Sequence, residues 1–217
     1  MLYHSDKLYY IRLYNLESEH MNEYQLTGKH IKCHQVSQNV FGRVFLIPYL
    51  DNGTFKLMVF DNEQVLCDLH INELLGIDNS TVSINGVHDP IINACFISDE
   101  NIFVNLFHKM SGTNWHFKYS YTERTLLGEA VATQLNCSQL NFPINNFYDF
   151  ERESVYCFYR HGESITVNLD DLTKVRTQTI VTESLGQMYF IYNEIVVANS
   201  SDTVLFFKRV GTRNDDN

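Results

Sequence analysis

The sequence predicts an all-β protein built from a repeated unit of short strands. Segment 164–180 is a clear example, because Ile165, Val167 and Leu169 alternate with polar residues before an acidic turn at Asp170. The chain of 217 residues also contains 15 Phe and 13 Tyr, which supply large side chains for a core. Helical patterns are weak, and only segments 71–76 and 122–130 are compatible with one or two turns of helix.

A repeated order of strands and turns connects distant parts of the chain. Segments 53–87, 100–133 and 153–180 share the same succession of strand, turn and strand, and segment 186–210 carries the beginning of a fourth copy. The turns recur every 42 to 52 residues. The positions that mark them are Asp51, Asp99, Glu151 and Asn193 for the first turn and Glu73, Glu123 and Asp171 for the third.

Four short strands in a repeat of roughly 40–50 residues are characteristic of a propeller blade. In period and strand order, residues 40–210 resemble β-propellers of the kelch and WD-repeat kind. The usual motifs are absent, since no two glycines are adjacent and Trp115 is followed by His116 instead of an aspartate. The resemblance implies a small β-propeller, or a segment of one, with four to five four-stranded blades.

The repeat also predicts how the single domain, residues 1–217, is divided. The last unit lacks its outer strand, so Lys7–Tyr14 is expected to pair beside Thr203–Val210 and close the last blade. The alternative is a segment that another polypeptide chain completes. The expected parts are a partial or degenerate blade at 1–39, blades at 40–88, 89–140 and 141–183, an incomplete blade at 184–210 and a tail at 211–217.

Charge and composition argue against several classes of partner. The chain carries 16 Lys and Arg against 26 Asp and Glu, a formal charge of −10 that disfavours nucleic acid. It has no segment of ~20 apolar residues and no signal-like start, so no membrane association is expected. Five scattered cysteines predict reduced thiols and a cytoplasmic location.

No motif predicts a catalytic, metal or cofactor site. His30 and His34 flank Cys33, but on a strand the two histidines would lie ~13 Å apart. That separation is too large for one zinc ion bound at ~2.1 Å. Phosphate-binding glycine loops are also absent from the sequence.

The preferred interpretation is a non-enzymatic protein-interaction scaffold, a subunit of a larger assembly. Its expected partner-binding residues are Leu140 and Phe142 in the loop 134–146, and Met110 and Trp115 in the loop 109–115. Propeller geometry puts both loops on one rim. Two alternatives remain open: these side chains fold back onto the blades, or the interface lies at the opposite rim, near the acidic turns around Asp51, Asp99 and Glu151.

The second interpretation is a small propeller glycoside hydrolase. Such an enzyme projects carboxylates from its innermost strands into the central channel, where one acts as general acid and another as base or nucleophile. The residues available for these roles are Asp89, Asp149 and Glu183, at a spacing near one per blade. Each of them also fits an ordinary turn or loop position.

Overall fold

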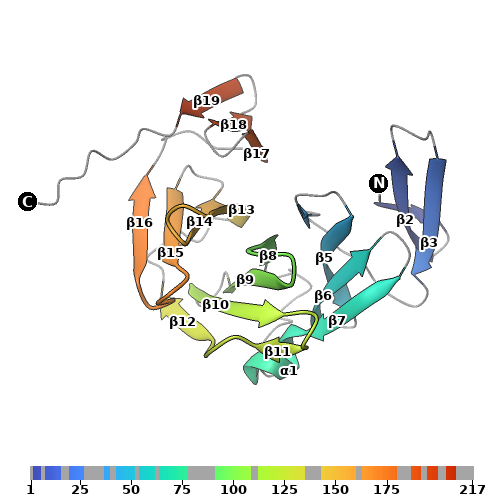
Figure 1. Ribbon diagram of the computed structural model, residues 1–217, viewed down its shortest axis with the longest axis horizontal. Helices are drawn as coiled ribbons and strands as arrows, with labels where there is room; N and C mark the ends of the chain where they lie inside the picture. The colour runs from blue at the N-terminus through green and yellow to red at the C-terminus, as the bar shows by residue number, and fades with distance from the viewer. Residues whose placement is uncertain are drawn as a thin grey trace, which may run out of the picture. The chain divides into compact units, whose positions relative to one another are not determined.

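In the computed structural model, most of the described residues lie in antiparallel strands (Figure 1), which confirms the all-β prediction. The chain divides into two compact units, Met1–Asn136 and Cys137–Asn217. The structure describes residues 2–5, 8–15, 20–26, 37–39, 43–51, 54–61, 64–77, 91–108, 112–134, 143–159, 163–179, 187–191, 195–199 and 204–208.

The first unit contains three antiparallel sheets. In the first sheet, β1 and β3 pair with the two edges of β2. The second sheet has the strand order β4-β5-β6-β7. The third sheet has the strand order β8-β9-β10, and β11 and β12 both pair with β10. The elements are β1 (Leu2–Ser5), β2 (Leu8–Asn15), β3 (His20–Leu26), β4 (Ser37–Gln38), β5 (Val44–Asp51), β6 (Thr54–Asp61), β7 (Val65–His70), α1 (Ile71–Leu75), β8 (Ile91–Phe96), β9 (Asn101–His108), β10 (Thr113–Ser120), β11 (Thr125–Leu126) and β12 (Val131–Gln134).

The second unit contains two antiparallel sheets. Their orders are β13-β14-β15-β16 and β17-β18-β19, so neighbours in the chain are neighbours in the sheet. The strands are β13 (Pro143–Asp149), β14 (Ser154–Tyr159), β15 (Glu163–Asn168), β16 (Val175–Thr179), β17 (Gln187–Ile191), β18 (Ile195–Asn199) and β19 (Val204–Lys208).

The predicted repeat is visible in the connections between these strands. Segment 164–180 forms β15 and β16 with a turn between them. Segment 71–76 contains α1, and segment 122–130 contains a turn and β11. The predicted turn positions fall where strands end: Asp51 closes β5, Asp99 and Glu151 lie between β8 and β9 and between β13 and β14, and Glu73, Glu123 and Asp171 follow β7, β10 and β15. Asn193 lies outside the described residues.

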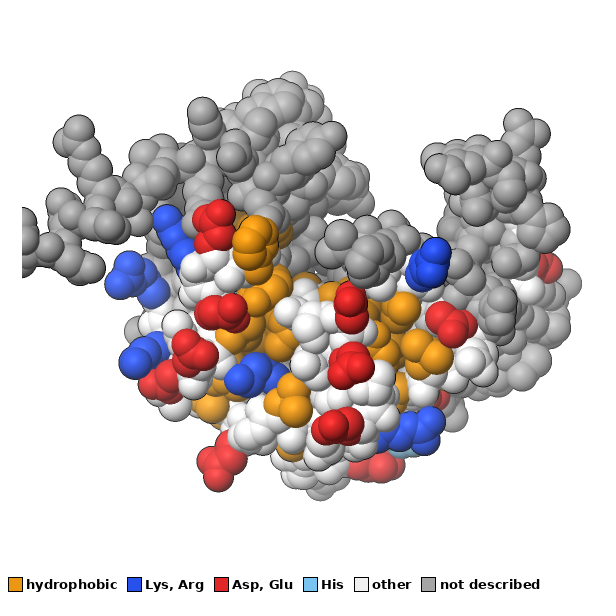
Figure 2. All heavy atoms as spheres, in the orientation of Figure 1, with side chains coloured by type: hydrophobic (Ala, Val, Ile, Leu, Met, Phe, Trp, Pro, Cys, Tyr) orange, Lys and Arg blue, Asp and Glu red, His pale blue; other side chains and the backbone are white. Residues whose placement is uncertain are grey.

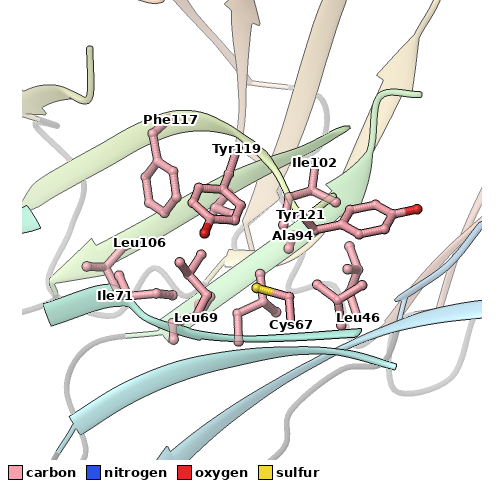
Figure 3. Close-up of a cluster of buried hydrophobic side chains, with 14 of the residues drawn as sticks. Leu46, Cys67, Leu69, Ile71, Ala94, Ile102, Leu106, Phe117, Tyr119 and Tyr121 are labelled. Atoms are coloured by element: carbon pink, nitrogen blue, oxygen red, sulfur yellow. The ribbon is translucent and has the colours of Figure 1, made fainter. Parts of the chain in front are cut away.

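The core of the first unit lies between the β4–β7 sheet and the β8–β10 sheet (Figure 3). Because side chains alternate along a strand, Ile102, Val104 and Leu106 share one face of β9, and this face is fully buried. Leu46, Leu57 and other side chains of the β4–β7 sheet belong to the same cluster.

Two polar contacts join the same pair of sheets. The hydroxyl of Ser37 donates to the carbonyl of Ala94 at 2.7 Å. The Arg124 guanidinium donates to the carbonyl of Leu66 at 3.3 Å. Leu66 belongs to the edge strand β7. An edge strand exposes unpaired backbone groups to which another chain can hydrogen-bond, and this contact satisfies one of them.

The β13–β16 sheet has an apolar face of its own. Val155 and Cys157 of β14 lie opposite Val167 and Ile165 of β15, and all four side chains are fully buried. The alternation first noted in segment 164–180 therefore corresponds to a buried face of β15.

The expected role of Lys7–Tyr14 as the outer strand of the last blade needs correction. This segment lies largely in β2, which is hydrogen-bonded to β1 along one edge and to β3 along the other. A strand has only two edges, and from Tyr9 to Ile11 both edges of β2 are occupied. In this structure β2 therefore has no free edge along those residues for Thr203–Val210.

Two further observations concern the predicted organisation of the chain. Ser37 and Gln38, expected in the unit 1–39, form β4 and pair with β5 of the following sheet. No helix within the described residues has the length and apolar composition to span a membrane.

Candidate protein-interaction surface

Of the four partner-binding residues expected from the sequence, the structure describes only Trp115. Leu140, Phe142 and Met110 lie outside the described residues. Trp115 lies within β10, which begins at Thr113, and its half-buried side chain packs against the core cluster of the first unit. The structure thus gives Trp115 a packing role.

Of the three carboxylates considered for glycoside hydrolysis, Asp89 and Glu183 lie outside the described residues. Asp149 ends β13 and is only 2% exposed. Its carboxylate accepts the backbone N–H of Glu151 at 3.2 Å, and its carbonyl accepts that of Arg152 at 3.3 Å. Asp149 therefore holds the turn between β13 and β14, as Asp does in an Asx-turn.

A metal site has no support in the described part of the chain. There, no group of three or more His, Cys, Asp and Glu side chains could hold a metal ion. His30, Cys33 and His34 fall outside this part.

One fully buried titratable group among the described residues is His116 of β10, which lies in a polar cluster. Its Nδ1 lies 3.4 Å from Nδ2 of Asn105, the residue opposite it on β9, and its Nε2 lies 3.1 Å from Oγ1 of Thr133. Thr133 in turn donates to the carbonyl of Asn114 at 3.3 Å. A neutral imidazole that accepts at Nδ1 and donates at Nε2 satisfies the contacts to Asn105 and Thr133, and Nδ2 of Asn114 also lies 3.3 Å from Nε2. Burial lowers the pKa of His116 from 6.5 to about 4, which suits a structural role.

An exposed aromatic side chain stands out in the second unit. Phe150, in the turn between β13 and β14, is 56% exposed, more than any other large apolar side chain in the described residues. Glu151 and Glu153 of the same turn are also exposed. The turn therefore carries an exposed apolar ring and two exposed carboxylates.

The backbone of this turn is fixed by several hydrogen bonds. In addition to the two bonds to Asp149, the hydroxyl of Ser154 donates to the carbonyl of Arg152 at 2.9 Å. Glu153 has a φ of 46°, a left-handed conformation that closes the turn into β14. Its carboxylate accepts the Tyr148 hydroxyl at 2.9 Å.

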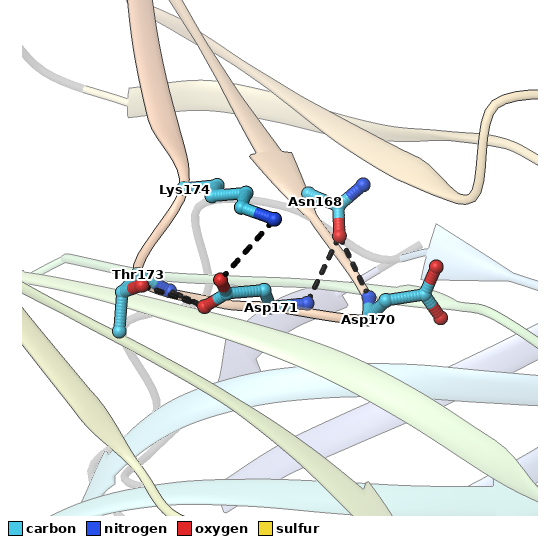
Figure 4. Close-up of polar contacts among 5 residues, drawn as sticks. All are labelled: Asn168, Asp170, Asp171, Thr173 and Lys174. Atoms are coloured by element: carbon cyan, nitrogen blue, oxygen red, sulfur yellow. Dashed lines mark hydrogen bonds and ion pairs between the residues drawn. The ribbon is translucent and has the colours of Figure 1, made fainter.

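The turn between β15 and β16 is built around Asn168 (Figure 4). Its side-chain oxygen accepts the backbone N–H groups of Asp170 and Asp171, both at 2.9 Å. Asp171 accepts the Thr173 hydroxyl at 2.6 Å and lies 3.5 Å from Nζ of Lys174. The hydrogen bonds from Thr173, with a smaller contribution from Lys174, lower the pKa of Asp171 below its ordinary value. Asp171 is therefore held in place as a carboxylate near neutral pH.

The two turns lie side by side at one end of the β13–β16 sheet. The N–H of Leu169, directly after β15, donates to the carbonyl of Glu153 at 2.8 Å. The first unit repeats this bond, because the N–H of Tyr121, directly after β10, donates to the carbonyl of Glu100 at 3.1 Å. We call Phe150, Glu151, Glu153, Asp170 and Asp171 the Phe150 surface.

The charges of the Phe150 surface are not fully balanced by its neighbours. Its four carboxylates are accompanied in the two turns by Arg152 and Lys174 alone. Arg152 donates to the Tyr156 hydroxyl at 3.1 Å, and this bond raises its pKa. On the face shown in Figure 2, acidic, basic and apolar side chains of the described residues are interspersed. The Phe150 surface therefore combines an apolar ring with excess negative charge.

The sequence-based interpretation considered the acidic turn near Glu151 as an alternative contact region but did not single out Phe150. A usable signal was present in the segment "DFERES", residues 149–154. Turn geometry there depends on Asp149 and on the left-handed Glu153, and it requires no aromatic side chain. A large apolar residue between turn-forming polar residues indicates a role outside the turn.

The succession of antiparallel meander sheets defines a class of fold, the β-propeller. The chain is similar in structure to the β-propeller domain of Cps50 (Swd1) from Myceliophteria thermophila, with a TM-score of 0.60 and 9% identity. It is also similar to Sqt1 from Saccharomyces cerevisiae, with a TM-score of 0.58 and 10% identity. These likenesses confirm the predicted fold.

Each alignment covers nearly all of this chain but a smaller share of the solved structure. The Cps50 domain covers 97% of this chain, whereas the chain covers 66% of that domain. For Sqt1 the two values are 93% and 53%. The chain thus spans about two thirds and about half of the two solved structures. No family model and no curated protein matches the sequence.

Proposed function

We propose that this chain is a non-enzymatic protein-interaction scaffold, a β-propeller subunit of a larger assembly. The observation that carries the proposal is the propeller fold itself, with sheets whose ends carry rigid, exposed turns. In such folds the strands form the framework, and the turns are free to carry recognition residues. This step from fold to function is an analogy at the level of the fold.

We also propose a cytoplasmic location. Cys67, Cys95 and Cys157 are buried free thiols. Burial raises the pKa of Cys95 and of Cys67, which keeps both in the unreactive thiol form. Inert, unpaired thiols of this kind suit a reducing compartment.

The loop that contains Leu140 and Phe142 remains part of the proposal as one contact region, with Met110 beside it on the expected rim. Trp115 is less suitable as a probe of binding. Because it packs against the core, its replacement by Ala would lower stability as well as any affinity.

The glycoside hydrolase gains no support from the geometry of its one described carboxylate. Asp149 is buried and bonded within its own turn, and its hydrogen-bonding is that of a structural residue. We therefore place enzymatic activity second to binding.

Affinity purification of the tagged chain from its native cell extract, with and without Leu140→Ser, Phe142→Ser, tests the proposal. We expect specific, stoichiometric partners for the wild-type chain. We also expect loss of some of them in the double variant at an almost unchanged melting temperature, because loop residues outside strands contribute little to stability. The same preparations are tested for hydrolysis of aryl glycosides. Hydrolysis without any specific partner would contradict the scaffold and favour the enzyme.

A further inference from the structure

We propose that the Phe150 surface is the docking site for a basic segment of a partner protein, in which an apolar side chain flanked by Lys or Arg packs against the Phe150 ring. This inference rests on the proposed scaffold function and adds to it a place on the fold and a chemistry for the partner.

The first argument is that the turn does not need its aromatic residue. The corresponding turn of the preceding sheet, Ile97–Glu100, also joins the first two strands with four residues, and the position that matches Phe150 is taken by Ile97, whose side chain is half-buried. That turn is closed by Ser98, whose hydroxyl accepts the N–H groups of Glu100 and Asn101 at 3.3 and 3.1 Å. The same connection is therefore made there without an exposed ring.

The second argument is preorganisation. Asp149 and Glu153 fix the first turn, Asn168 fixes the second, and the bond from Leu169 to Glu153 joins them. A rigid site loses little conformational entropy when it binds, so a single aromatic anchor on it contributes more affinity than the same ring on a mobile loop. Aromatic residues are also among the commonest anchors of protein interfaces.

The third argument is charge. The two adjacent turns carry four carboxylates in addition to the ring, against two cations that are engaged with Tyr156 and Asp171. The whole chain carries a formal charge of −10, which adds a long-range attraction for cationic partners. Phosphate-bearing partners are repelled by the same charges, so a basic protein segment is the complementary occupant.

The test uses a library of random dodecapeptides displayed on phage and selected on the wild-type chain. Selection is followed by titration of the best synthetic peptide. We expect the selected peptides to share an apolar residue flanked by at least two Lys or Arg. Phe150→Ser should weaken their binding about 30-fold, the loss expected for an interface hot spot. Asp170→Lys should also weaken peptide binding, because it replaces a carboxylate by a cation. The affinity of the wild-type chain for the peptide should fall as the salt concentration rises, because the interacting charges are exposed.

A matched control comes from the preceding sheet. Asp99→Ser changes an exposed residue of the corresponding turn and should leave peptide affinity unchanged within about twofold. Thermal unfolding of each variant separates lost binding from lost structure, and we expect Phe150→Ser to unfold within a few degrees of the wild type.

Three outcomes would overturn the inference: the library yields no binders, the binders lack basic residues, or their affinity survives Phe150→Ser. The scaffold itself is judged separately by purification from native extract. If the wild type and Phe150→Ser capture the same partners there, the scaffold function holds and the Phe150 surface is not its docking site.

Discussion

At the scale of single residues, the buried polar groups of this chain stabilise its strands and turns. His116 occupies the interior of the β8–β12 sheet as a neutral side chain, bonded to Asn105 and Thr133. Phe103 stacks beside it at 6.0 Å between ring centroids. The described side chains that the imidazole contacts are all uncharged, so nothing among them compensates a proton on His116.

This environment predicts a loss of stability in mild acid. Above pH 6.5, His116 is neutral in both the folded and unfolded states and contributes no pH dependence. As the pH falls from 6.5 towards 4, the unfolded state binds a proton that the folded state excludes, which favours unfolding. We expect a loss of about 2 kcal/mol by pH 5 and about 3 kcal/mol below pH 4.

Urea unfolding of the wild type and of His116→Gln at pH 7.5 and pH 5.0 measures this contribution. Gln is neutral at both pH values, so the variant should lack most of the loss even if it is less stable overall. An equal loss in wild type and variant would show that other groups cause the acid sensitivity.

At the scale of elements, the repeat is expressed in the turns as much as in the strands. Ser120 ends β10 and its hydroxyl accepts the N–H of Glu123, while Asn168 ends β15 and its amide oxygen accepts the N–H of Asp171. The two repeats thus close the same turn with different side chains at the same position.

The Asn168 turn therefore provides a test with a matched control. Asn168→Ala removes the acceptor of two N–H groups and should lower the free energy of unfolding by about 1–2 kcal/mol. Asn168→Asp retains an oxygen at that position and should keep most of the stability. Chemical denaturation of the three proteins distinguishes them, and equal stability of Ala and Asp variants would contradict the role assigned to this side chain.

The strands and turns were predictable because alternation and turn residues are local properties. The alternation of Ile165 and Val167 with polar residues predicts from the sequence alone that these two side chains are buried. The spacing of Asp99, Glu151 and the other turn residues predicts the repeat. The partners of β2 were not predictable, since strand pairing depends on which edges are free in space. Likewise Trp115 was placed in a loop, residues 109–115, whereas β10 begins at Thr113 and includes it.

At the scale of the whole molecule, the chain is an array of sheets, each formed by strands that follow one another in sequence. In such arrays each repeat contacts mainly its neighbours, and stability is approximately the sum of intrinsic and neighbour contributions. The core cluster of the first unit illustrates this, since its described members come from β5 to β10 and the segments that follow β7 and β10.

This organisation predicts the effect of removing the β1–β3 sheet. Deleting residues 1–15 removes β1 and β2 and leaves β3 with a bare edge, whereas deleting residues 1–26 removes the whole sheet. We expect the shorter deletion to aggregate, because an unpaired edge strand recruits other chains. We expect the longer deletion to stay soluble and to unfold in one transition.

The only tryptophan of the chain, Trp115, packs against the core of the next two sheets, so its fluorescence reports on that core directly. Light scattering and fluorescence-monitored unfolding of both deletions provide the measurement. If the longer deletion lost the fluorescence transition, the β1–β3 sheet would be required for the folding of that core, and the sheets would not be additive units.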